Sequence, residues 1–135
     1  MSWADSLIKI ATYEVEARQK RLADIVERRM GLETQLAVLH AEGEAEAKRA
    51  GQDAETGWYH IGYADGLRIR KAAVEAEIDA MAAEERGARD ALSEAFEEQK
   101  KYEHVAESAR QAAVKESARR DTAALDELGL RRKAQ

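Results

Sequence analysis

The residues of this chain that could do chemistry are three histidines, many carboxylates and one glycine-bearing stretch. His40, His60 and His104 do not have the i, i+4 spacing of a zinc-binding helix. The chain has no cysteine, which excludes thiol nucleophiles, thiolate ligands and disulfides. Residues 57–67, GWYHIGYADGL, match neither the GxGxxG spacing nor the GK[ST] ending of phosphate-binding loops. We therefore expect no enzyme activity, no metal site and no cofactor.

The C-terminal segment is basic, although the whole chain has a net charge of −5. Residues 108–135 carry seven basic and four acidic side chains, a net of +3, so residues 1–107 carry −8. This asymmetry predicts an acidic partner for the basic end, and the alternative is a solvated helix end without a partner. The segment has no aromatic residue to stack on bases, and residues 106–124 offer mainly alanines and Val114. We expect neither nucleic-acid binding nor direct membrane binding.

The composition favours long helices. Of 135 residues, 36% are charged and 5% aromatic, and there is no proline. A compact globule of this length usually has turn prolines and more large apolar residues. No apolar run approaches the ~20 residues that span a bilayer, and MSWADSLIKIATYEVE is not a signal peptide. We expect a cytoplasmic protein.

Apolar residues of the first half recur at alternating spacings of three and four, which predicts a coiled-coil helix. These spacings define a seam of ten positions, of which eight are apolar. The other two are arginines, whose aliphatic stems can lie along the seam. The seam is Ile8, Ala11, Val15, Arg18, Leu22, Ile25, Arg29, Leu32, Leu36, Leu39. Large apolar residues then stop. We expect Gly51 to cap the end of this helix, and Asp53 or Thr56 to cap the start of the next.

A second seam of the same spacing follows in the second half. Its positions are Leu67, Lys71, Val74, Ile78, Met81, Glu85, Ala88, Leu92, Ala95, Gln99, Tyr102, Ala106, Ala109, Ala113. Three further leucines, Leu125, Leu128 and Leu130, are in a different phase, which predicts a stutter or a frayed terminal segment.

Two seams with one break predict an all-α fold, a long antiparallel two-helix coiled-coil hairpin with an overhanging C-terminal helix. We expect a single hairpin over residues 1–135, with helices at about 3–50 and 58–131 and a turn at about 51–57. Counting outward from an apex near Ala54 places Ile8 opposite about Lys100. The second helix then extends beyond the first by about 25–30 residues, or about 40 Å.

The stretch GWYHIGYADGL is unusual in this chain. It holds one of two tryptophans, two of four tyrosines and three of eight glycines. It follows the predicted apex, where the facing helix has no large seam residues. Its aromatic residues therefore either plug the hairpin end or form an exposed docking surface.

Three features together resemble the FliJ family of flagellar type III protein export, in its alphaproteobacterial form. They are the proline-free two-helix plan, the ending ARRDTAALDELGLRRK at residues 118–133, and the aromatic segment from Trp58 to Tyr63. The resemblance covers essentially the whole chain.

This resemblance implies a non-enzymatic partner of the flagellar export ATPase (FliI), similar to the central stalk of rotary ATPases. It also implies contact with the export gate protein FlhA and with export chaperones, and a peripheral place at the inner face of the cell membrane through protein partners only. The residues expected to contact the ATPase ring are Arg110, Arg119, Arg120, Arg131, Arg132. Those expected to contact the gate are Leu36, Leu39, Trp58, Tyr59, Ile61, Tyr63, Leu67. The alternatives are a generic cytoplasmic coiled-coil scaffold and a stalk protein of a virulence-type type III secretion system.

The sequence departs from the family before the turn. Family members commonly carry large apolar or aromatic residues on both sides of the turn. Here, the residues between Leu39 and Gly57 are small, polar or charged. The expected gate contact therefore lies mainly after the turn.

Overall fold

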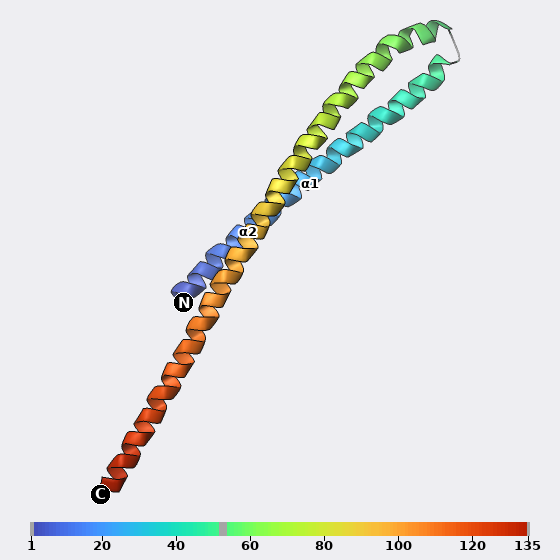
Figure 1. Ribbon diagram of the computed structural model, residues 1–135. Coiled ribbons are helices and arrows are strands. Elements are labelled where there is room, and N and C mark those ends of the chain that lie inside the picture. The colour runs from blue at the N-terminus through green and yellow to red at the C-terminus, as the bar shows by residue number, and fades with distance from the viewer. Residues whose placement is uncertain (1, 52–53, 135) are drawn as a thin grey trace. The chain divides into compact units, whose positions relative to one another are not determined.

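The protein consists of two long helices. The computed structural model describes the backbone of residues 2–51 and 54–134, and the side chains of residues 2–51 and 58–134. Helix α1 spans Trp3–Ala50 and helix α2 spans Ala54–Ala134, as Figure 1 shows. No described residue lies in a strand. The predicted all-α, antiparallel two-helix hairpin is confirmed.

Helix α1 begins with a reciprocal cap made by Ser2 and Asp5. The Asp5 amide donates to Ser2 Oγ at 3.2 Å. In return, Asp5 Oδ2 accepts from the Ser2 hydroxyl at 2.9 Å and the Ser2 amide at 3.3 Å. These hydrogen bonds from Ser2 hold the pKa of Asp5 below its usual value. They satisfy backbone donors that the first helical turn leaves without a partner.

The connection between the helices differs from the sequence expectation. Gly51 follows the last residue of α1, and its amide donates to the Ala47 carbonyl at 3.3 Å. The φ angle of Gly51 is not positive, so this residue does not form a left-handed cap. The helical hydrogen-bond pattern continues through it instead. Helix α2 starts at Ala54 rather than near residue 58, so Thr56 lies inside it and is not its N-cap. Asp53, the other expected cap, lies outside the described residues.

The chain divides into two compact units, each containing antiparallel segments of both helices. One is formed by residues 17–93 and the other by residues 1–16 with residues 94–135. The core of the 17–93 unit is a cluster of Leu39, Leu67 and Val74. Further apolar residues pack against this cluster: Leu32, Leu36, Tyr63, Ile78.

Gly43 permits close packing of α2 on α1 beside this cluster. A Cβ atom at Gly43 would lie 2.6 Å from Leu67 Cδ2, well inside normal contact. Leu67 is buried, so its methyl group occupies the space that a side chain at position 43 would need. A larger residue at position 43 would therefore force the Leu67 side chain to shift.

An ion pair joins the two helices within the 17–93 unit. Arg29 Nε donates to Glu85 Oε2 at 2.8 Å, and their side chains are only 25% and 13% exposed. Arg29 also donates to Glu33, and Glu85 also accepts from Arg89, each at 2.8 Å. Glu33 and then Glu85 raise the pKa of Arg29. Arg89 and then Arg29 lower the pKa of Glu85 against the opposing effect of burial. Arg29 of the first seam and Glu85 of the second, two of the polar exceptions, are thus partners of each other.

The second unit has a narrower, alanine-rich seam. Ala4, Ala11 and Val15 of α1 are buried, as are Ala95 and Ala106 of α2. The Gln99 amide donates to Thr12 Oγ1 at 3.1 Å across the helices. Gln99, a polar position of this seam, thus has a partner on the facing helix.

The buried part of the second seam ends earlier than predicted. Ala109 and Ala113 are exposed, because α1 starts at Trp3 and its first turn faces Ala106. Beyond Ala113, helix α2 continues to Ala134, and its described side chains are exposed except for half-buried Glu116. We call residues 114–134 the overhang. Of the two alternatives, a stutter or a frayed terminal segment, the frayed segment is wrong, because the three leucines lie in unbroken helix.

Candidate partner-binding surfaces

The arginines expected to contact the ATPase ring lie on exposed positions of α2, and most are paired within the helix. Arg110 donates to Glu107 at 2.8 Å, and Arg131 donates to Glu127 at 2.9 Å. Arg119 and Arg120 share Glu116, at 2.8 and 3.2 Å. For Arg132, the described residues provide no ion pair. The positive charge of this surface is therefore partly compensated by its own carboxylates.

These pairs contribute little to the stability of the surface. Arg110 lowers the pKa of Glu107, and Arg119 lowers the pKa of Glu116. Exposed ion pairs of this kind are weak because water screens them. An acidic partner can therefore exchange with Glu107 or Glu116 at little cost. The last turn is basic through Arg131, Arg132 and Lys133, which also suits the negative end of the helix dipole.

The residues expected to contact the gate fall into two groups. Leu39 and Leu67 are buried in the core cluster, and Leu36 and Tyr63 pack against it. The other three are exposed: Trp58 by 76%, Tyr59 by 71% and Ile61 by 64%. The structure thus brings Leu36, Leu39, Tyr63 and Leu67 together in the core, and it leaves the other three side chains on the surface.

The aromatic segment combines the two interpretations that the sequence left open. Tyr63 is half-buried against the core cluster, and the Arg70 guanidinium lies 5.9 Å from its ring centre. Trp58 and Tyr59 instead line a shallow surface hollow together with Ile61 and Gly62. Tyr63 therefore contributes to packing, whereas Trp58, Tyr59 and Ile61 form what we call the aromatic surface.

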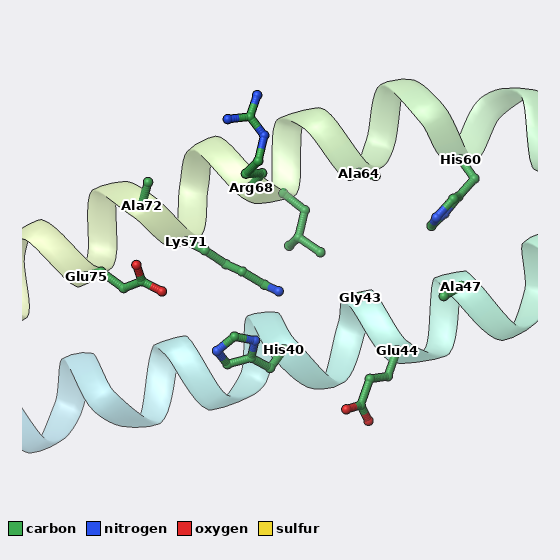
Figure 2. Close-up of a pocket in the computed structure, with 11 residues that line it drawn as sticks. His40, Gly43, Glu44, Ala47, His60, Ala64, Arg68, Lys71, Ala72 and Glu75 are labelled. Carbon is green, nitrogen blue, oxygen red and sulfur yellow. The ribbon is translucent and has the colours of Figure 1, made fainter.

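A groove between α1 and α2 was not predicted from the sequence. It has a volume of about 630 Å³ and lies in the 17–93 unit on both sides of Leu67, with Glu44 and Glu75 as well as Arg68 and Lys71 in its lining. Its α1 side includes His40, Gly43 and Ala47, and its α2 side includes His60 and Ala64. Figure 2 shows the His60 ring and the Lys71 side chain extending from α2 toward α1. The sequence signal for this groove is the loss of large seam residues after Leu39.

His60 has an unusual environment within this groove. Its Nδ1 atom is inaccessible to solvent and has no hydrogen-bond partner among the described residues. Buried nitrogen atoms of this kind are usually paired in folded proteins.

A second exposed apolar set lies on α1 and was also missed. Trp3, Ile10 and Tyr13 are each more than half exposed, at spacings of seven and three residues. This spacing places them on one side of the helix, away from the seam. The seam periodicity of the sequence gives no separate signal for this stripe.

In the described part of the chain, no three His, Asp or Glu side chains lie together in a group that could hold a metal ion. None of the described helices combines the length and apolar character needed to cross a membrane.

The chain is similar to curated proteins over nearly its whole length. It is 54% identical over 132 residues to a protein named "Flagellar FliJ protein" from each of two strains of Caulobacter vibrioides. The match covers 98% of this chain and 95% of each relative. No family model matches the chain. No solved structure matches it either.

Proposed function

The chain belongs to the family of flagellar FliJ proteins, and on that basis we propose that it is a non-catalytic component of the flagellar export apparatus. In this proposal the overhang of α2 enters the central hole of the export ATPase ring (FliI). The aromatic surface contacts the export gate protein FlhA. Export chaperones are further partners, and protein contacts alone hold the chain at the inner face of the cell membrane.

The observation that carries the ATPase proposal is the overhang itself. Helix α2 continues alone beyond Ala113, and a single helix is slimmer than the two-helix part of the chain. Its arginines are exposed and paired only with carboxylates of the same helix. A slim, basic, single helix fits a ring whose subunits present acidic groups around a central hole.

Charge reversal in the overhang tests the ATPase contact. We expect Arg119→Glu with Arg120→Glu to abolish co-purification with FliI and any change in its ATPase rate. Arg21→Glu with Arg28→Glu, at exposed positions of α1, is the matched control and should leave both unchanged. Deleting residues 108–135 should have the same effect as the overhang variant and should leave a helical hairpin by circular dichroism. Unchanged FliI binding by both overhang variants would refute this part of the proposal.

Truncation of the aromatic surface tests the gate contact. We expect Trp58→Ala with Tyr59→Ala to weaken FlhA binding by at least tenfold, because exposed aromatic residues are the commonest anchors of interfaces. The melting temperature should hardly change, since both side chains are exposed. Met30→Ala with Val38→Ala removes exposed apolar surface elsewhere and is the control. Equal binding by the two double variants would exclude a gate contact through Trp58 and Tyr59.

A further inference from the structure

The two-helix part of the unit formed by residues 1–16 and 94–135 ends abruptly at the first turn of α1. Ala4 of α1 is 4% exposed and Ala106 of α2 is 2% exposed, so the seam is closed at this level. Ala109, the next seam position of α2, is exposed. The hydrogen bonds between Ser2 and Asp5 hold the start of α1 in helical form. The unit therefore changes from two helices to one within about one helical turn.

A surface hollow of about 320 Å³ lies at this place, between the first turn of α1 and the part of α2 from Ala106 to Ala113. We call the surface around the hollow the step. Trp3 lines the step and is 64% exposed, so a large apolar side chain lies where the second helix begins. Arg110, the first of the arginines expected to contact the ATPase ring, lines its α2 side. The step is therefore continuous with the basic surface of α2.

The widths of the two parts decide what a hole can admit. A single helix with its side chains is about 10–12 Å across. Two packed helices have axes about 8–10 Å apart, so together they measure about 18–22 Å across. A hole whose walls reach the arginines of the single helix is therefore too narrow for both helices. From Arg110 to Ala134, α2 rises by about 36 Å, which is the length that such a hole can receive.

We propose that the step is the stop that sets how far α2 enters the ATPase ring, and that Trp3 packs against the entrance of the ring. The stop rests on the ring contact proposed above, because only a ring that surrounds the single helix meets the step. A ring that contacts Arg110 meets Trp3 next, since both side chains border the same hollow. Exposed tryptophans are common anchors of protein interfaces, which suits Trp3 to this contact.

Alkylation of single cysteines measures how far α2 enters. The chain has no cysteine, so Val114→Cys and Glu97→Cys each place one thiol at an exposed position of α2. Position 97 lies in the two-helix part, about 13 Å along α2 from Ala106. In the complex with hexameric FliI and a non-hydrolysable ATP analogue, we expect a maleimide to react at least tenfold more slowly at position 114. The rate at position 97 should equal the rate measured without FliI.

Replacement of Trp3 tests the contact at the entrance itself. We expect Trp3→Ala to weaken FliI binding about tenfold, with little change in melting temperature because this side chain is exposed. Trp3→Phe should retain most of the binding, since it keeps an aromatic ring. Tyr13→Ala removes an exposed aromatic side chain about 15 Å further along α1 and is the matched control, which should bind as the parent protein does.

The outcomes separate the stop from the ring contact. Equal protection of positions 97 and 114 would show that both helices enter the ring. Equal binding by the Trp3→Ala and Tyr13→Ala variants would exclude the contact at the entrance. Either result overturns the stop and leaves α2 in the ring. A thiol at position 114 that stays fully reactive in the complex overturns the ring contact and the stop together.

Discussion

Gly43 gives a sharp test of how the helices pack, because alanine at this position has two opposing effects. In an exposed helix interior, alanine is about 1 kcal/mol more stable than glycine. At position 43, however, the new Cβ would lie 2.6 Å from Leu67 Cδ2, so that methyl group has to retreat by about 1 Å to reach ordinary contact. Leu67 is 6% exposed and packs in the core cluster with Leu39 and Val74, and overpacking of this kind costs about 1–3 kcal/mol. We expect Gly43→Ala to range from neutral to about 2 kcal/mol destabilising.

Gly31 provides the matched control in the same helix and the same compact unit. A Cβ atom there meets nothing within 4 Å, so Gly31→Ala should give the full gain of about 1 kcal/mol. The two variants should therefore differ by about 1–3 kcal/mol in urea unfolding followed by circular dichroism. In a Leu67→Ala background the obstructing methyl groups are absent, and Gly43→Ala should become as stabilising as Gly31→Ala. Equal stabilisation by both glycine replacements in the parent protein would show that Leu67 does not pack against position 43.

Three further predictions concern charges and the helix cap. The pKa of Glu85 is lowered in the folded protein, so ionised Glu85 contributes to stability above its unfolded pKa of about 4.3. This contribution is lost as the pH falls through the folded pKa. Below about pH 4.3 the melting temperature should therefore fall less steeply in Glu85→Gln than in the parent protein. Glu116→Gln frees both Arg119 and Arg120, so binding to FliI should become tighter and more sensitive to salt in titrations at several ionic strengths. Ser2→Ala removes the hydroxyl that caps α1 and should cost about 1 kcal/mol of stability, with faster amide exchange confined to the first turn.

The seams were predictable from the sequence because a coiled coil repeats one local rule. The predicted first-seam positions are all buried or half-buried, from Ile8 to Leu39. Each position depends on neighbours three or four residues away, so an error at one place does not spread to the next.

The connection, the cross-helix pairs and the groove depend on longer-range information. The start of α2 was placed too late because Gly57 was read as a turn residue, whereas it lies inside the helix. Counting from the apex placed Arg29 about six residues away from Glu85, its observed partner, because a small error in the turn shifts every facing residue. In the sequence, the groove is marked only by the lack of large apolar seam residues. Small seam residues are compatible both with close packing of the two helices and with a space between them. Exposure of Trp58 and Tyr59, rather than burial, likewise follows from the direction of α2 and not from the residue types.

The polar residues in the seams relate the packing to both candidate surfaces. A seam made only of leucines and alanines fits itself equally well after a slip of one heptad, which would move α2 along α1 by about 10 Å. Arg29 with Glu85 and Thr12 with Gln99 have partners in one register only, so a slip would leave half-buried polar groups unpaired. The same slip would shift Leu67 away from Gly43 and change how much of α2 extends beyond Trp3. The groove and the overhang both exist in their present form because this register is held. Replacing Arg29 and Glu85 together by leucine should therefore keep the melting temperature of the protein while weakening partner binding at the overhang. A pair that only stabilised the fold would instead lower the melting temperature when replaced.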